Sequence, residues 1–546
     1  MSPSTDTNSP ILDVRDLSVA FRSRAGELTT VVSEVSFTVR AGTTLALVGE
    51  SGSGKSTTAA ALNGLLPSTG RITNGDILFD GQSIVGLSER DLRRLRGARI
   101  GFVPQDPMSN LNPLMRIGDQ ITESLTAHGR PVTIEGHDAA VALLEMVGIP
   151  DAERRARQYP HEFSGGMRQR ALIAIGLACR PPLLIADEPT SALDVTVQRR
   201  ILDQLEALAR DLGTAVVLIT HDLALAAERA DQVAVMSAGR IVELGSAEQI
   251  VESPEHPYTR ELMAAVPSFR SRALVTERAP PPDSASEPLV VVSGLRKEFA
   301  VRDARGAAAR FTAVDGVSFG IHRGETVAIV GESGSGKSTT ANLVLGLEDP
   351  SEGSIVFDGV DIATLTTRER FAWRRRIQPV FQNPYASLDP RYTVERSICE
   401  PLKVHGVGNA RSRSERAAEL LERVALPAAM GERLPHELSG GQRQRVAIAR
   451  AIALSPELVV LDEAVSALDV LVQAQILELL ADLQSELGLS YLFISHDLAV
   501  VRMMTHTVHV MQAGVIVESG SPASLFDDPV DPYTVELVNA IPGRHV

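Results

Sequence analysis

Two identical stretches of the chain have the composition of a phosphate-binding loop. The sequence Gly-Glu-Ser-Gly-Ser-Gly-Lys-Ser-Thr occupies Gly49–Thr57 and recurs residue for residue at Gly331–Thr339. Each copy follows a short apolar run and precedes a predicted helix, which is the context of a P-loop. The glycines let successive N–H groups point at phosphate oxygens, and the helix N-terminus adds partial positive charge. We predict that the lysine of each copy contacts the β- and γ-phosphates and that the next serine binds Mg²⁺; these are Lys55 with Ser56 and Lys337 with Ser338.

A pair of acidic residues ends a second apolar run in each half of the chain. The pairs are Asp187-Glu188 and Asp462-Glu463. An Asp at the end of a buried strand can hold Mg²⁺, while the adjacent Glu points the other way and can orient and deprotonate a water molecule. We therefore predict two metal-binding aspartates and two general bases. Gly/Ser-rich turns that bind nothing, and acids that only cap a strand, are the alternatives; the recurrence of both motifs in the same order disfavours them.

The motifs belong to one unit that occurs twice. Further matches in the same order are Ser164–Gly166 with Ser439–Gly441, His221-Asp222 with His496-Asp497, and Pro257–Thr259 with Pro532–Thr534. Between the copies, residues 279–286 are rich in Pro, Ser and Ala, a composition typical of an extended tether. We therefore place a first domain at residues 10–271, a linker at 272–288 and a second domain at 289–546.

Apolar runs before the motifs predict the sheets that position them. These runs are Thr44–Val48, Pro182–Ala186, Ala215–Ile219, Thr326–Val330, Leu458–Leu461 and Tyr491–Ile494. Their continuous hydrophobicity is typical of parallel strands that are covered on both faces. Helical spacing occurs in Asp138–Val147, Val197–Leu212, Glu415–Val424 and Val472–Leu487. Each half is therefore predicted to be an α/β sandwich.

Composition excludes several classes of protein. The 546 residues are 44% hydrophobic and 22% charged, which is globular usage. A net charge of −15 disfavours bulk nucleic-acid binding. Cys179 and Cys399 are too few for a disulfide framework, a four-thiolate zinc site or an iron–sulfur cluster, so we expect a reducing, cytosolic compartment. Residues 1–10 do not have the pattern of a signal peptide, and no apolar run reaches the roughly 18 residues of a membrane span.

Together these motifs resemble those of ATP-binding cassette (ABC) proteins, and each half is similar to one nucleotide-binding domain of that family. The family's signature matches Phe163–Met167 and Leu438–Gln442, and its D-loops match Ser191–Asp194 and Ser466–Asp469. Its Q-loop glutamines match Gln105 and Gln382, its switch histidines His221 and His496, and its adenine-stacking aromatics Phe21 and Phe299. The resemblance implies an α/β fold with two tandem P-loop NTPase (ABC-type) domains, each with a RecA-like α/β core and a helical subdomain. For Phe21 and Phe299, packing in the core is the alternative.

The resemblance further implies two composite ATP sites within one chain, so no stable homodimer is expected. Each ATP would lie between the P-loop of one half and the signature of the other. One site would combine Lys55, Asp187, Glu188 and His221 with Ser439, Gly440, Gly441 and Gln442; the other would combine Lys337, Asp462, Glu463 and His496 with Ser164, Gly165, Gly166 and Met167. The other ATP-binding positions are Phe21, Gly49, Ser51, Gly52, Gly54, Ser56, Thr57, Gln105, Phe299, Gly331, Ser333, Gly334, Gly336, Ser338, Thr339 and Gln382. The implied Mg²⁺ ligands are Ser56, Gln105, Asp187, Ser338, Gln382 and Asp462.

Two departures from the family pattern both concern the site that contains Glu463. Met167 stands where the signature usually has Gln, and Ala464-Val465 replace the Pro-Thr that usually follows the catalytic Glu, as Pro189-Thr190 do in the first half. Neither change removes a catalytic carboxylate, lysine or histidine. We therefore expect both sites to hydrolyse ATP, with any asymmetry being one of rate.

The Pro-Tyr tails and Q-loops resemble those of ATPases from peptide/nickel-type importers. This resemblance implies a peripheral subunit at the cytoplasmic face of a bacterial membrane, which drives peptide import through two separate permease chains and an extracytoplasmic solute-binding protein. Nickel chelates, glutathione and opine-like solutes are alternative cargoes. A soluble tandem ABC protein acting on ribosomes or DNA is disfavoured by the short neutral linker and the charge. The family's frequent cysteine cluster is lacking, so no iron–sulfur site is carried over.

The loops after the two Q-loop glutamines are expected to contact the permeases. These loops are Pro107–Pro113 and Pro384–Pro390. Apolar residues in a loop that should be exposed are best explained by a partner surface; the residues concerned are Met108, Leu111 and Tyr385.

Overall fold

A computed structural model describes residues 9–23, 26–129, 136–190, 193–267, 271–275, 287–302, 308–383, 387–465 and 468–541. Several predicted features lie outside these ranges. They are the whole Pro/Ser/Ala-rich stretch at residues 279–286, the first two residues of each D-loop (Ser191, Ala192, Ser466 and Ala467), and Pro384 and Tyr385 of the second Q-loop.

In the first half, a six-stranded sheet has the order β10-β9-β3-β8-β7-β6. Its strands are β3 (Thr44–Val48), β6 (Ile100–Val103), β7 (Leu183–Asp187), β8 (Ala215–Ile219), β9 (Gln232–Ser237) and β10 (Arg240–Ser246). All neighbours pair in parallel except β9 and β10. A four-stranded antiparallel sheet, β2-β1-β4-β5, covers one face; it consists of β1 (Leu12–Arg22), β2 (Leu28–Val39), β4 (Gly70–Phe79) and β5 (Gln82–Ser83).

The second half repeats this architecture. Its six-stranded sheet has the order β16-β17-β18-β13-β19-β20, and its four-stranded sheet the order β12-β11-β14-β15. The strands are β11 (Val290–Arg302), β12 (Ala308–Ile321), β13 (Thr326–Val330), β14 (Glu352–Phe357), β15 (Val360–Asp361), β16 (Ile377–Val380), β17 (Leu458–Asp462), β18 (Ser490–Ile494), β19 (Thr507–Gln512) and β20 (Val515–Gly520).

In each half, helices pack between the two sheets, cover the other face of the large sheet and build a helical subdomain. In the first half they are α1 (Lys55–Leu62), α2 (Glu89–Leu95), α3 (Pro107–Asn110), α4 (Ile117–Thr126), α5 (Gly136–Met146), α6 (Ala152–Ala156), α7 (Gly165–Leu177), α8 (Val195–Leu212), α9 (Leu223–Arg229), α10 (Ala247–Glu252) and α11 (Pro257–Ala265). In the second half they are α13 (Lys337–Val344), α14 (Thr367–Trp373), α16 (Val394–Val404), α17 (Ala410–Arg423), α18 (Gly440–Ile452), α19 (Val470–Leu487), α20 (Leu498–Met504), α21 (Pro522–Asp527) and α22 (Pro532–Asn539).

Burial on both faces explains why the predicted strands are continuously apolar. In β7, Leu183 and Ile185 pack toward the four-stranded sheet, whereas Leu184 and Ala186 pack toward the helical subdomain. A strand that faces two cores has no side for polar residues. The predicted α/β class is confirmed, and the six predicted strands and four predicted helices agree with the structure within a few residues at their ends.

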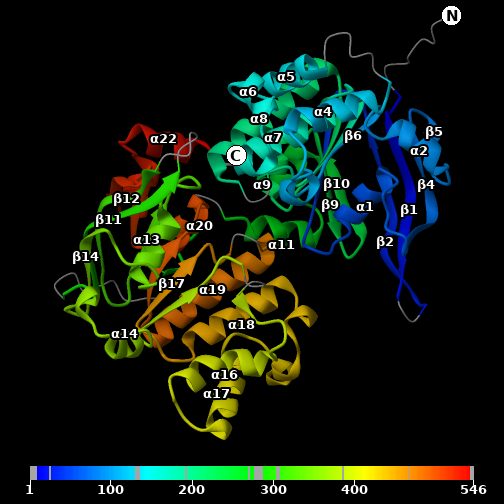
Figure 1. Cartoon of the computed structure of the whole chain (residues 1–546). Coiled ribbons are helices and arrows are strands. Elements are labelled where there is room, and N and C mark those ends of the chain that lie inside the picture. Colours follow the sequence, from blue (N-terminus) through cyan, green and yellow to red (C-terminus); the bar gives the residue numbers. More distant parts are fainter. Residues whose placement is uncertain are drawn as a thin grey trace, which may run out of the picture.

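The two halves contact each other through helices near their ends. Figure 1 shows the first half (blue to green) beside the second (green to red), with α11 against α19. α22 likewise contacts α8. The start of the predicted linker is also attached, because Leu274 donates its N–H to Met503 O (2.9 Å) and Val275 is buried in the second half's core. These two residues precede the Pro/Ser/Ala-rich stretch, so the tether stays a prediction.

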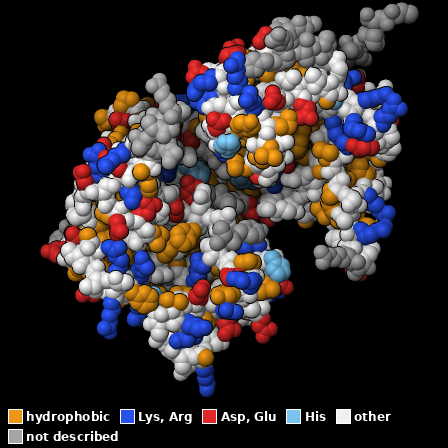
Figure 2. Space-filling model, viewed as in Figure 1, with side chains coloured by type: hydrophobic (Ala, Val, Ile, Leu, Met, Phe, Trp, Pro, Cys, Tyr) orange, Lys and Arg blue, Asp and Glu red, His pale blue; other side chains and the backbone are white. Residues whose placement is uncertain are grey.

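The side chains on the molecular surface and the hydropathy of the helices are those expected from the amino-acid composition. On the face viewed in Figure 2, basic and acidic side chains are interspersed with hydrophobic ones. Among the residues that the structure describes, no helix combines the length and apolarity that a bilayer span requires.

Candidate functional site

Every predicted catalytic motif follows the carboxyl end of a parallel strand. The P-loop follows β3, Asp187 ends β7, and His221 and Gln105 follow β8 and β6. Because these strands are parallel neighbours, their carboxyl ends lie at one edge of the sheet, where α/β proteins bind ligands. The same order recurs in the second half. The sheet therefore brings together residues that are far apart in the sequence.

The P-loop backbone requires glycine where it approaches a neighbouring strand. Gly49 has φ 150°, and a Cβ there would lie 2.1 Å from Met236 O. Its counterpart Gly331 would meet Met511 O at the same distance. Gly54 and Gly336 adopt left-handed φ values directly before α1 and α13. These glycines let the loop turn sharply into the helix N-terminus.

The predicted phosphate-binding lysines are buried and point back into their own loops. Lys55 Nζ donates to Gly49 O (2.7 Å) and Glu50 O (2.8 Å), and Lys337 makes the equivalent bonds to Gly331 O (2.9 Å) and Glu332 O (2.7 Å). Burial lowers the pKa of both lysines, against the opposing effect of nearby carboxylates. Phosphate oxygens would offer each ammonium charged acceptors in place of these carbonyls.

Each half also places a hydroxyl and a buried carboxylate together, as Mg²⁺ requires. Ser56 Oγ lies 3.4 Å from Asp187 Oδ1, and Ser338 Oγ lies 3.3 Å from Asp462 Oδ1. Burial, followed by the neighbouring Glu188, raises the pKa of Asp187 to about 6. A carboxylate destabilised in this way gains from a cation, and hard oxygen ligands of this kind suit Mg²⁺, which keeps waters and phosphates as its other ligands. The donor set therefore fits the metal.

Glu188 and Glu463, which directly follow the predicted metal-binding aspartates, have unusual backbone conformations. Both are non-glycine residues with left-handed φ, 45° and 48°. Such strain is costly and clusters at functional sites. Because each Glu follows its Asp directly, this turn gives the two carboxylates separate positions, as the sequence predicted.

A histidine and a glutamine hold each of these glutamates. Glu188 Oε1 lies 3.2 Å from His221 Nδ1, and its Oε2 accepts a hydrogen bond from Gln105 Nε2 (2.7 Å). Burial alone would raise the pKa of Glu188, but His221, Lys55 and Gln105 bring it below its ordinary value. Burial would lower the pKa of His221, but Glu188 raises it overall. Glu188 therefore stays ionised at neutral pH, the state that a general base needs.

The second half repeats this arrangement. Glu463 Oε2 lies 3.5 Å from His496 Nδ1 and accepts from Gln382 Nε2 at 2.7 Å. Both glutamines thus bond the glutamates, and their assignment as Mg²⁺ ligands stays a prediction.

The two signature loops differ in one hydrogen bond. Ser164 Oγ and Ser439 Oγ cap α7 and α18 by accepting from the N–H groups of Met167 and Gln442, both at 3.3 Å. Only Gln442 reciprocates, because its Oε1 accepts from Ser439 N–H at 2.9 Å. Met167 instead packs against the core of the helical subdomain. The departure noted in the sequence thus removes a side-chain bond that holds the signature serine.

Each half lies within electrostatic reach of the P-loop lysine of the other half. The charge of Asp469 acts on Lys55, and that of Asp194 acts on Lys337. These aspartates cap α19 and α8 by accepting from the N–H groups of Val472 (3.1 Å) and Val197 (3.0 Å). The structure thus brings the D-loop ends across to the opposite P-loops. The placement of the signatures over those loops stays a prediction.

The predicted adenine-stacking aromatics are half-buried. Phe21 packs against Gly70 of the neighbouring strand, where an added Cβ would lie 2.8 Å from its ring. The ammonium of Lys297 lies 5.1 Å from the centre of the Phe299 ring. Both contacts are compatible with packing and with stacking, so the adenine role stays a prediction.

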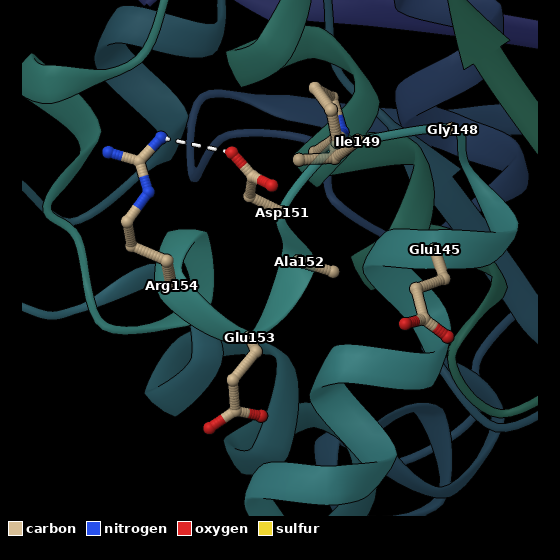
Figure 3. Close-up of a pocket in the computed structure, with 8 residues that line it drawn as sticks. Glu145, Gly148, Ile149, Asp151, Ala152, Glu153 and Arg154 are labelled. Carbon is tan, nitrogen blue, oxygen red and sulfur yellow. Dashed lines mark hydrogen bonds and ion pairs between the residues drawn. The ribbon is translucent and has the colours of Figure 1, made fainter.

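Residue-by-residue interpretation missed two contacts to the P-loops. Tyr258 and Tyr533 of the Pro-Tyr tails each accept a backbone N–H, from Glu50 (3.2 Å) and Glu332 (2.8 Å). The recurrence of the tail in both halves was the signal in the sequence. A separate pocket of about 740 Å³, shown in Figure 3, lies between α5 and α6, where Arg154 pairs with Asp151; it contains none of the predicted site residues.

Comparisons with known proteins identify the family. Residues 32–191 and 314–466 match the family described as ABC transporter, and residues 242–289 match the family described as oligopeptide/dipeptide transporter, C-terminal region. The chain is 46% identical over 558 residues to the glutathione import ATP-binding protein GsiA of Salmonella typhimurium (strain LT2), covering 97% of this chain and 89% of that protein. GsiA of Escherichia coli (strain K12) is 45% identical over 560 residues, with the same coverage. Among solved structures, the dimeric ATP-binding cassette MJ0796 bound to ADP and Pi is 31% identical, covers 43% of this chain and 98% of its own, and has a TM-score of 0.39.

Proposed function

Because the chain belongs to the ABC transporter family, as an importer ATPase with two ATPase domains in tandem, we propose that it drives the import of short peptides, with glutathione as the first cargo to test. The observation that carries this proposal is the identity to glutathione import ATPases along nearly the whole chain, together with the peptide-transporter tail. Glutathione is itself a tripeptide, so the two descriptions agree. Residues 10–271 and 289–546 would be the two catalytic halves.

Each group of site residues has a step in the proposed cycle of ATP binding and hydrolysis. The P-loops and signatures bind ATP, and Mg²⁺ on the Ser–Asp pairs would neutralise phosphate charge. Glu188 and Glu463, held by the histidines and glutamines, would take the proton of the attacking water. Binding would close the halves and hydrolysis would reopen them at the cytoplasmic face of the membrane. Two permease chains and an extracytoplasmic binding protein would complete the importer.

Cargo is tested by uptake in the source bacterium with this gene deleted. Uptake of labelled glutathione, of labelled dipeptides and of chelated nickel is measured in parallel. Glutathione or dipeptide uptake should fall with the deletion and return with the wild-type gene, but not with the Glu188→Gln/Glu463→Gln double variant. Loss of nickel uptake alone would refute the peptide proposal.

The described part of the Q-loops supports a permease surface, with one correction. Met108 is 63% exposed, as a docking residue would be, and its Sδ accepts a hydrogen bond from Arg168 Nη1 (2.8 Å). Leu111 is 2% exposed and packs in the helical subdomain with Ile117 and Phe163, so its predicted role on a partner surface is wrong. Leu111 directly follows α3 and is needed by the core. Tyr385 lies outside the described residues.

In the second half, a groove connects the catalytic residues to the surface. This groove has a volume of about 760 Å³, and its lining includes Gln382 and Asp462 as well as the exposed side chains of Phe381 and Val404. A permease segment in the groove would contact the glutamine that bonds Glu463. Movement of the permease would then be transmitted to Glu463, the proposed general base, through the side chain of Gln382.

Charge at these apolar positions should uncouple transport from hydrolysis. We expect Met108→Glu and Phe381→Glu to retain ATPase activity in the isolated chain but to lower the amount of cargo imported per ATP. Exposed apolar residues at the opposite edges of the two sheets supply matched controls, Leu244→Glu in β10 and Val515→Glu in β20. Equal transport per ATP in all four variants, measured in proteoliposomes, would show that the assigned surface does not contact the permeases.

A further inference from the structure

The tail helices α11 and α22 lie where the two halves meet, and each contacts a P-loop. Tyr258 Oη accepts from Glu50 N–H, and Tyr533 Oη accepts from Glu332 N–H. Burial raises the pKa of both hydroxyls to about 12, so they remain protonated. Neither tyrosine is a member of the site described above, and each lies more than 200 positions from the loop that it contacts.

The tyrosines contact the residue that also holds the phosphate-binding lysine. Glu50 gives its N–H to Tyr258 and its carbonyl to Lys55 Nζ. The second half has the same pair of bonds on Glu332. This residue is the point at which the strand becomes the P-loop. A shift of the tail would therefore move the first peptide units of the loop and, through them, the lysine.

On its other side, each tail helix packs against the opposite half. In the first tail the contact is apolar, because Tyr258 and Leu262 share a cluster with Val470 and Leu471 of α19. The charge of Asp469 also reaches Tyr258. The contact therefore joins the first half's P-loop to the D-loop end of the second half.

The second tail makes a polar version of the same contact. Glu536 pairs with Arg200 of α8, and Arg199 donates to the carbonyl of Asn539. The charge of Asp194 reaches Tyr533. The hydroxyl of Thr196 also donates to the carboxylate of Glu332 in the P-loop itself. Two chemically different contacts thus lie at equivalent places, which favours a shared role over accidental packing.

We propose that Tyr258 and Tyr533 are positioning residues for ATP hydrolysis: each hydroxyl fixes the start of its P-loop, and its tail helix makes that position depend on the approach of the other half. The proposal rests on ATP binding at the P-loops, which the proposed function also requires. It gives the Pro-Tyr tails a role in reporting closure of the halves to the phosphate site.

The test compares variants in which a tyrosine loses its hydroxyl, either beside a P-loop or away from both P-loops. Tyr258→Phe and Tyr533→Phe keep the rings and remove one hydrogen bond to each loop. Tyr491→Phe is the matched control, because Tyr491 is fully buried and its hydroxyl donates to Leu480 O (2.9 Å), away from both P-loops. Steady-state ATP hydrolysis is measured for the full chain with its permeases. We expect the Tyr258→Phe/Tyr533→Phe double variant to raise KM for ATP about threefold to tenfold, the range of one ordinary hydrogen bond, and to change kcat less than twofold.

A double-mutant cycle between residues of the two halves distinguishes positioning of the P-loop from local packing. Leu471→Ala removes part of the surface on which α11 packs without touching the first P-loop. If the tail transmits the approach of the halves, the effects of Leu471→Ala and Tyr258→Phe on KM should be less than additive when combined. An unchanged KM in the tyrosine variants, an equal rise in Tyr491→Phe, or full additivity in the cycle would overturn the proposal. This comparison of KM values does not depend on which cargo the uptake experiment identifies, because it measures ATP hydrolysis in the wild type and in each variant.

Discussion

The Glu188→Gln/Glu463→Gln double variant should hydrolyse ATP about 10²- to 10⁴-fold more slowly than the wild type while it binds ATP normally. Glutamine keeps the shape of each side chain and can still bond the neighbouring histidine and glutamine, but it cannot accept a proton from water. The structure shows why these carboxylates are ready to do so. The contacts with His221 and His496 lower their pKa, and the left-handed backbone separates them from the predicted metal-binding aspartates.

Initial-rate hydrolysis and equilibrium ATP binding should be measured on the same preparations. Glu325→Gln is the control, because Glu325 is a buried carboxylate at the opposite end of β13 from the P-loop and accepts from Thr507 Oγ (2.7 Å). It should leave the rate of hydrolysis nearly unchanged. Wild-type hydrolysis in the double variant would show that neither glutamate is a general base.

The single variants should differ in the same experiment. The Glu188 site is expected to use the signature in which Gln442 supports Ser439, whereas the Glu463 site is expected to use the one in which Met167 cannot. Val465 also lacks the hydroxyl that Thr190 has in the first half. We therefore expect Glu188→Gln to depress turnover more than Glu463→Gln; tight coupling of the sites would make the two equally inactive. A faster single-turnover rate in Glu188→Gln than in Glu463→Gln, with permeases present, would reverse this ranking.

Replacing either phosphate-binding lysine should remove one of two bound ATP molecules. Lys55→Ala deletes a buried ammonium and leaves the carbonyls of Gly49 and Glu50 without it, so both the charge and the order of one loop are lost. Lys337→Ala should do the same to the other loop. Lys403→Ala, on the exposed surface of α16, is the matched control and should bind two.

The measurement is equilibrium ATP binding in the Glu188→Gln/Glu463→Gln background, so that hydrolysis does not change the count. One ATP per chain is expected for each single lysine variant and none for the pair. Two ATP molecules on Lys55→Ala would show that this lysine does not define a site.

Local sequence was sufficient for the parts of the fold whose pattern is set by short-range constraints. The P-loops were predictable because glycine is required where their backbones turn and approach a neighbouring strand, and strands such as β3 were predictable because burial on both faces leaves an uninterrupted apolar run. The four-stranded antiparallel sheets were not foreseen. In β1, register shifts interrupt its pairing with both neighbours and blur the alternation that would mark a half-buried strand.

Contacts between segments that are distant in the sequence could not be predicted either. Leu111 seemed exposed in a loop motif, but the helical subdomain uses it as a core residue. Tyr258 belongs to a tail whose recurrence was visible, yet no local rule connects that tail to Glu50 or to α19 of the other half. Such contacts depend on how the sheets and helices pack, and the sequence pattern of one segment does not contain that information.

One chain is expected to contain both ATP sites and to close upon itself. Light scattering of the Glu188→Gln/Glu463→Gln chain at saturating MgATP, combined with the count of bound ATP, tests it most directly. The reciprocal approach of Asp469 to Lys55 and of Asp194 to Lys337 predicts a particle of 58.4 kDa that holds two ATP molecules. A stable particle of two chains that forms only with ATP would contradict it.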